Sequence, residues 1–230
     1  MIGFVAGVGI LIGLVVLHEL GHLVVARLCG IPVVSFSVGF GPRALEWRRN
    51  GIAYRLGVIP LGGYIRYGDI EGPARRPGAL SAVYLGGPLA NVAVAALLLA
   101  VAERGILAGL TQTAGFGVEI VRAFGSLLAS ADLGQLGGPI LVTQWAGAAA
   151  AAGLPPLLRL TAVLSLNLAV LNLLPLPVLD GGRALMLTVE SAFGQRLKAP
   201  VERMVAVSGF AILILLMLVA LANDLARLAA

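Results

Sequence analysis

The chain has 230 residues, of which 59% are hydrophobic and 12% are charged, and its mean hydropathy is +1.00. Soluble domains carry about a quarter charged residues, so the composition excludes an ordinary soluble protein and indicates an integral membrane protein. The net charge of +5 comes almost entirely from scattered arginines, which argues against a nucleic-acid partner. The single cysteine, Cys29, excludes an intramolecular disulfide.

Uncharged apolar runs predict about four membrane-spanning helices. A bilayer core needs roughly 20 apolar residues, and we expect spans at about 2–28, 80–103, 157–178 and 203–223. Two further segments, at about 113–130 and 138–152, are too polar or too short to span, and we expect interfacial helices there. The fold class is therefore a mainly α polytopic membrane protein, organised as a single domain over residues 1–230.

Between about 33 and 67 the pattern changes to that of strands. The run "VVSFSVGF" alternates large apolar residues with serine and glycine. Asn50-Gly51 separates two strand-like runs, which is a strong signal for a two-residue hairpin turn. We therefore expect a small β-rich segment against the membrane, with an irregular loop as the alternative.

The arginines distinguish the two sides of the membrane. Seven lie between residues 43 and 76, whereas residues 104–159 contain three. By the positive-inside rule, the segments after the first span and after Asp180 are cytoplasmic, and both termini lie outside. The first apolar run lacks the basic start and the cleavage site of a signal peptide, so we expect it to remain as a helix.

The two histidines of the chain lie in "HELGH", inside the first predicted span. Polar side chains are costly within a bilayer. His18 and His22 stand at i and i+4, so both project from one helical face. Two imidazoles at this spacing can share Zn²⁺, and Glu19 can act as general base for the attacking water. The alternative is a pair of histidines that only pack or hydrogen-bond within a helix bundle.

A catalytic zinc site needs a third protein ligand, and Asp180 is the best candidate. It follows the third predicted span and precedes a glycine pair, and Pro175 and Pro177 break the helix before it. Irregular backbone at membrane depth survives only where it is buried or lines a cavity. Asn172 is a candidate donor to a substrate carbonyl or to a freed helix carbonyl. Asn91, in the second span, needs a polar partner, which a simple packing hydrogen bond would also supply.

Five segments, in order along the chain, resemble the site-2 proteases, which are intramembrane zinc metalloproteases. They are "HELGH", "VGFGP…YRLGVIPLGGYIRYGD", "GGPLANV", "LGGPI" and "SLNLAVLNLLPLPVLDGGRAL", and the bacterial branch that cleaves anti-sigma factors is the most similar. The resemblance implies one Zn²⁺ per chain, held by His18, His22 and Asp180, with Glu19 as the base.

The same resemblance implies where a substrate binds. It assigns substrate contacts to Asn172, Pro175 and Asn91. It also implies that the β-rich segment pairs with an unwound substrate as an added strand. We expect the pairing edges at 36–39 and 57–64, the second of which includes Gly62 and Gly63.

The implied function is hydrolysis of a peptide bond within or near the transmembrane segment of a single-span membrane protein, such as an anti-sigma factor or a signal-peptide-like substrate. We expect a multi-pass protein of the bacterial inner membrane with its active site toward the cytoplasm. Bacterial relatives usually carry PDZ domains after the second span, and here we expect none, which leaves room for a separate regulatory or PDZ-bearing partner.

Three other readings stay open. A membrane metal transporter would not need Glu19 between the two histidines, nor a strand-forming segment beside them. A catalytically silent relative would bind membrane helices without cutting them, and it would have no need to keep Glu19. A membrane zinc protease with a soluble substrate pocket would usually take a glutamate as the third ligand.

Overall fold

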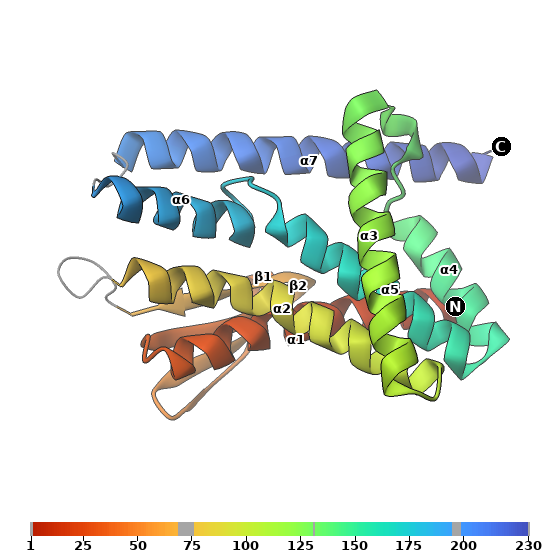
Figure 1. Ribbon diagram of the computed structural model, residues 1–230, viewed down its shortest axis with the longest axis horizontal. Coiled ribbons are helices and arrows are strands. Elements are labelled where there is room, and N and C mark those ends of the chain that lie inside the picture. The colour runs from red at the N-terminus through yellow and green to blue at the C-terminus, as the bar shows by residue number, and fades with distance from the viewer. Residues whose placement is uncertain (1, 69–75, 131, 195–198, 230) are drawn as a thin grey trace. The chain divides into compact units, whose positions relative to one another are not determined.

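The computed structural model describes residues 2–68, 76–130, 132–194 and 199–229 (Figure 1). In this part of the chain, four helices are long and apolar enough to cross a membrane: Gly3–Leu28, Pro77–Ala102, Leu154–Leu173 and Pro200–Ala229. Together with a small β-sheet, they confirm the predicted class of a mainly α polytopic membrane protein. The elements in chain order are α1 (Ile2–Leu28), β1 (Val33–Arg49), β2 (Ile52–Tyr67), α2 (Pro77–Ala102), α3 (Ile106–Ser130), η2 (Leu133–Gln135), α4 (Pro139–Ala152), α5 (Leu154–Leu173), α6 (Asp180–Phe193) and α7 (Ala199–Ala229).

Two boundaries differ from the sequence-based expectation. The third span was expected to continue to about 178, but α5 ends at Leu173 because Pro175 and Pro177 follow within one turn. No element was predicted directly after Asp180, and the structure has α6 there. The glycine pair after Asp180 lies in the first turn of this helix. Helices α3 and α4 contain the two segments expected at the interface, and α3 begins earlier, at Ile106.

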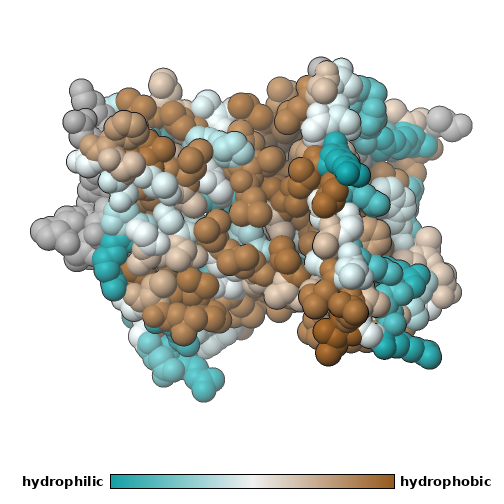
Figure 2. All heavy atoms as spheres, in the orientation of Figure 1, coloured by the Kyte–Doolittle hydropathy of each residue, from teal (hydrophilic) through white to brown (hydrophobic). Residues whose placement is uncertain are grey.

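Much of the surface is apolar. On the face drawn in Figure 2, broad brown areas of hydrophobic side chains are open to the surroundings. Helix α7 shows this at residue level, because Phe210, Leu215 and Leu218 are all more than half exposed. Exposed apolar surface on this scale is unfavourable in water, whereas lipid chains cover it at no cost. The exposed side chains therefore agree with the spanning assignment.

Strands β1 and β2 form an antiparallel hairpin around Asn50-Gly51. Both turn residues have positive φ, 50° for Asn50 and 79° for Gly51, as a type I′ turn requires. The two-residue hairpin turn predicted from the sequence is therefore confirmed.

Each long strand bends back and pairs twice. Residues 35–38 pair with 53–56 on one side and with 63–66 on the other, while 45–49 pair with 52–56. The ladder thus has the order 63–67, 33–38, 52–56, 45–49. The expectation that 36–39 is an edge was wrong, because Phe36 to Val38 have partners on both sides. Within the described residues the two edges are 63–67 and 45–49, since the register pairs of each lie on one side only. The other expected edge, 57–64, overlaps the first of these at residues 63 and 64.

The contacts divide the chain into two compact units. The unit made of Leu11–Asn91 and Leu171–Lys198 contains the sheet, α6 and the adjoining parts of α1 and α2. One core cluster joins α1, α2 and α6 through Ala26, Leu80, Val83 and Leu187. A second cluster seats the sheet on α1, where Leu23 packs against Phe36 and Ile52. Every residue of the predicted site belongs to this unit.

The other unit comprises Met1–Ile10, Val92–Val170 and Ala199–Ala230. Its core cluster brings together Ala95 and Leu99 of α2, Ile120 of α3, and Ala162 and Leu166 of α5. Within this unit α3 runs across the direction of α7 (Figure 1). The expectation that α3 lies at the membrane interface stays a prediction.

Helix α7 carries one buried carboxylate, Asp224, which caps the start of α4. Its oxygens accept hydrogen bonds from the backbone N–H groups of Gly138 (2.9 Å), Ile140 (2.9 Å) and Leu141 (3.0 Å). The first N–H groups of a helix have no partner inside it, and an anion is favoured there by the helix dipole. Asp224 is therefore explained by its structural role, although an acid in a spanning helix often marks a functional site.

Replacing Asp224 with alanine should lower the stability of the folded protein by about 2–3 kcal/mol, because one buried and two partly buried N–H groups lose their acceptor. Thermal unfolding in detergent micelles measures this. Asp132→Ala is the matched control, because that exposed aspartate caps one N–H, of Gly134, at 3.1 Å. Equal losses for the two variants would contradict the assigned role of Asp224.

Candidate metal centre

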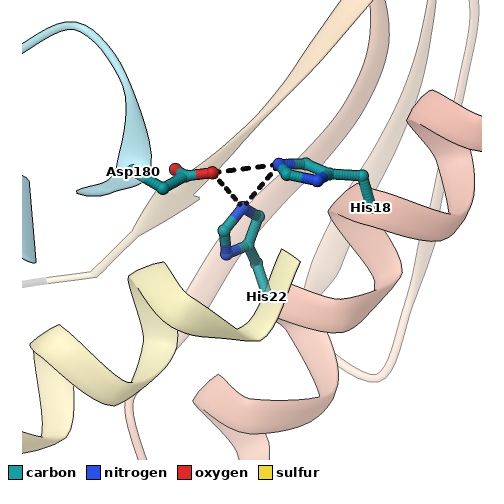
Figure 3. Close-up of side chains that lie close together, drawn as sticks. All are labelled: His18, His22 and Asp180. Carbon is teal, nitrogen blue, oxygen red and sulfur yellow. Dashed lines mark hydrogen bonds and ion pairs between the residues drawn. The ribbon is translucent and has the colours of Figure 1, made fainter. Parts of the chain in front are cut away.

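The two histidines project from α1 toward the same point (Figure 3). His18 and His22 are 6% and 5% exposed, and their Nε2 atoms lie 3.2 Å apart. The rings meet edge to face, with centroids 4.8 Å apart. Helical spacing of four residues produces this convergence, as expected from the sequence.

Asp180 reaches the same point from another part of the chain, the first residue of α6. Its Oδ2 lies 3.0 Å from Nε2 of His18 and 3.2 Å from Nε2 of His22. The connection from α5 is short and tightly packed against the start of α6. A Cβ added at Gly181 would lie 2.3 Å from the Leu173 carbonyl oxygen, and one at Gly182 would lie 2.1 Å from that of Leu176. Both glycines are therefore needed for the chain to turn here.

Contacts with α2 hold α6 in this position. The Ser81 hydroxyl donates to the Ala184 carbonyl over 3.4 Å, and Leu187 is buried against Leu80 and Val83. The guanidinium of Arg183 lies over the ring of Tyr84, 5.6 Å from its centroid. Asp180 is thus placed by a helix whose first two turns are docked on α2, which favours a rigid site.

The donor set fits a zinc ion. Bonds of 2.0–2.1 Å at tetrahedral angles place neighbouring ligand atoms about 3.3 Å apart, and the three distances here are 3.0, 3.2 and 3.2 Å. Two imidazoles and one carboxylate leave the fourth tetrahedral position open, as catalytic zinc sites do. Among the described residues, His18, His22 and Asp180 form the one cluster of three such side chains whose ligand atoms converge.

The protonation states also suit metal binding. Burial alone would raise the pKa of the Asp180 carboxyl, but its hydrogen bonds to His18 and His22 outweigh this and lower the pKa to about 2. The carboxylate is therefore ionised at neutral pH, as a ligand must be. Nδ1 of His22 lies 2.7 Å from the Val83 carbonyl and donates to it. The Nε2 proton that the Asp180 carboxylate accepts is then the one that a zinc ion would replace. The Gly87 N–H also lies 3.2 Å from this Nδ1. It does not donate a hydrogen bond to Nδ1 in this tautomer, because a nitrogen that carries a proton has no free lone pair.

Helix α2 comes very close to the ligand atoms at Gly87. A Cβ at this residue would lie 2.4 Å from Nε2 of His22 and 2.6 Å from Nε2 of His18. The neighbouring Gly86 packs on Gly21 of α1, where an added Cβ would lie 2.8 Å from the Gly21 carbonyl oxygen. Small residues at both places allow the two helices to cross this closely.

Glu19 is buried beside His18, with 8% of its surface exposed. The edge segment of the sheet lies directly over it, since a Cβ at Gly63 would be 2.7 Å from Cγ of Glu19. The preceding Gly62 has a φ of 77°, a conformation that favours glycine. The sheet edge, the carboxylate of Glu19 and the two histidines therefore lie together in one compact unit.

The structure also gives the positions of the three residues predicted to contact the substrate from α2, from α5 and from the connection after α5. Asn91 is completely buried in α2, and its Nδ2 lies 3.3 Å from Nδ1 of His18. Asn172 is half-buried in the last turn of α5, and Pro175 is exposed in the connection to α6. Their contacts with substrate stay predictions. Sequence reasoning missed Val83, whose backbone carbonyl orients His22, and the position of Gly87 against the ligand atoms.

Comparison with known proteins agrees with the arrangement of the site. The sequence profile of Peptidase family M50 matches residues 6–216. Zinc metalloprotease RasP of Geobacillus kaustophilus is 41% identical over 120 residues, which are 52% of this chain and 28% of that protein. Zinc metalloprotease RasP of Bacillus licheniformis is 40% identical over 121 residues, which are 52% of this chain and 29% of that protein.

The matched region is thus less than a third of the length of either relative. The family match, in contrast, covers most of this chain and includes His18, His22 and Asp180. The resemblance to the site-2 proteases is confirmed, and the chain belongs to Peptidase family M50.

Proposed function

We propose that this chain is a zinc endopeptidase that cuts a membrane protein within or near its transmembrane segment. The observation that carries the proposal is the convergence of His18 and His22 with Asp180 of α6. The two histidines, and Glu19 beside them, lie on a helix long and apolar enough to span the membrane. A soluble protease has no reason to place its polar machinery in such a helix, where burial of polar groups is costly.

The chemistry follows from the residues that surround the metal position. A bound zinc ion polarises the scissile carbonyl and lowers the pKa of water toward 7. Glu19 accepts a proton as the water oxygen bonds to the carbonyl carbon, and it returns this proton to the amine nitrogen as the C–N bond breaks. The products are a carboxylic acid and an amine, which become a carboxylate and an ammonium group when the second proton of the water passes from the acid to the amine. Because α6 and α2 hold the ligands, these groups need little reorganisation during the reaction.

The sheet supports a binding mode for the substrate. A transmembrane helix must unwind before its carbonyl can be attacked, and the freed backbone groups then need partners. Residues 63–67 stand at the sheet edge next to Glu19, so a substrate added there as a strand would pass close to the base. Asn172 and Pro175 at the end of α5, together with Gly62 and Gly63, are the proposed contacts.

The arginine distribution supports the orientation. It places the β-rich segment and the residues after Asp180 on the cytoplasmic side, with both termini outside and the active site toward the cytoplasm. The membrane would then be the bacterial inner membrane. A single-span protein such as an anti-sigma factor is the proposed substrate, and a separate regulatory or PDZ-bearing partner is proposed to select it.

Removal of zinc should abolish the activity and its return should restore it. The protein is reconstituted in liposomes with a single-span test substrate, treated with a membrane-permeable zinc chelator, dialysed, and supplied again with zinc. Cleavage is read from the fragment masses before treatment, after removal and after return. Cleavage that continues after complete loss of zinc would contradict the proposal. Uptake of zinc into the liposomes without cleavage would favour a transporter, and bound zinc with neither would favour a silent helix-binding relative.

A further inference from the structure

Three residues on one face of α2 lie against the two histidines of α1. Val83, Gly87 and Asn91 stand four residues apart, so they share a helical face. The carbonyl of Val83 meets Nδ1 of His22, and the amide of Asn91 meets Nδ1 of His18. Gly87, midway between them, faces both Nε2 atoms. The order is reversed along the two helices, as expected for antiparallel neighbours.

Each histidine must be held in one tautomer to bind a metal through Nε2. That nitrogen can offer a lone pair only if the proton is on Nδ1, and a hydrogen-bond acceptor at Nδ1 keeps it there. For His22 the acceptor is a backbone carbonyl at 2.7 Å. For His18 the group at this position is the side chain of Asn91, at 3.3 Å.

Asn91 is suited to this task rather than to contact with a substrate, because its side chain is completely buried. A rotation of the amide by 180° exchanges Oδ1 and Nδ2 without moving the rest of the side chain. We propose that Asn91 is a positioning residue whose Oδ1 accepts the Nδ1 proton of His18 and thereby directs Nε2 of His18 to the metal. This inference rests on the proposed zinc site, and it assigns to Asn91 a role that the family resemblance does not.

The test measures metal affinity rather than activity. Asn91→Leu keeps the volume but removes the acceptor, whereas Asn91→Asp keeps an acceptor in the same place. Loss of a group that orients a metal-binding histidine typically weakens metal binding by 10–100-fold. We expect that loss for Asn91→Leu in competition with a zinc chelator, and affinity within a few fold of the wild type for Asn91→Asp.

Asn167→Leu on α5 is the matched control. The Asn167 amide donates to a backbone carbonyl of its own helix, that of Val163, at 2.9 Å, so this variant should bind zinc as the wild type does. Cobalt substituted for zinc gives a second readout. Its visible absorption should change in Asn91→Leu and remain close to that of the wild type in Asn91→Asp, because the spectrum reports ligand geometry.

The outcomes separate the inference from the function on which it rests. Equal weakening by Asn91→Leu and Asn91→Asp would show a packing role and overturn the inference, while the zinc site would stand. Unchanged affinity in Asn91→Leu would overturn it as well. A wild-type protein that is folded and binds no zinc would instead overturn the proposed function, and with it the positioning role.

Discussion

Replacing Gly87 with alanine is expected to abolish zinc binding. The new Cβ would lie 2.4 Å and 2.6 Å from the Nε2 atoms of His22 and His18, in the space that the metal and its ligands need. The helix cannot move away at low cost, because Gly86 is packed on the backbone of Gly21. We therefore expect zinc below one tenth of the wild-type content, measured by mass spectrometry of the purified protein.

Gly78→Ala is the control for this substitution. Gly78 belongs to the same helix, and an added Cβ there meets no atom within 4 Å. Alanine favours a helix by roughly 0.8–1 kcal/mol over glycine, so this variant should be at least as stable as the wild type and should keep its zinc. A Gly87→Ala protein with a full zinc content would contradict the close approach of α2 to the ligands.

Replacing Glu19 with glutamine is expected to lower the rate of cleavage by roughly 10²–10⁴-fold, the contribution typical of a general base. Glutamine has nearly the same shape but cannot take a proton from water. Because Glu19 is not among the three converging ligands, the zinc content should not change. The rate is measured on a single-span substrate in liposomes, with zinc determined on the same samples.

Glu119→Gln makes the same chemical change on the exposed surface of α3, and its cleavage rate should equal that of the wild type. Loss of zinc in Glu19→Gln would mean that Glu19 acts as a ligand or supports one. A cleavage rate that does not change in this variant would mean that another group accepts the proton.

The three ligands could be predicted from the sequence because their signals are local. Two histidines four residues apart must share a helical face, and the prolines and glycines around Asp180 mark a turn beside a span. The positions of Pro175 and Pro177 also explain why α5 ends at Leu173, although the span was expected to continue to about 178. These features depend on covalent geometry and helical periodicity, which do not change with the tertiary context.

The surroundings of the ligands could not be predicted in the same way. Val83 acts through its backbone carbonyl. Every residue has such a carbonyl, so the identity of the side chain gives no signal of this role. A glycine pair such as Gly86-Gly87 is typical of close helix packing, but the sequence does not say that Gly87 would face imidazole rings. Asn91 clearly needed a polar partner, and the pairing of α1 with α2 that provides it is a long-range property.

In the sheet, too, local features could be predicted from the sequence, but long-range pairing could not. The strands and the turn at Asn50-Gly51 follow from alternation and turn chemistry, and both were predicted. The edge was misplaced at 36–39, because each long strand bends and pairs twice, and local alternation carries no information about the second partner. The other expected edge, 57–64, overlaps the observed edge segment at 63–67 in residues 63 and 64.

X-ray absorption at the zinc edge of the purified wild-type protein tests the central claim most directly. The account predicts one zinc per chain with only nitrogen and oxygen ligands at 2.0–2.2 Å, two of them imidazoles. Folded protein without zinc would contradict it. A sulfur ligand near 2.3 Å would contradict it equally, because that bond would require a sulfur-containing residue such as Cys29 in place of the His18, His22 and Asp180 site.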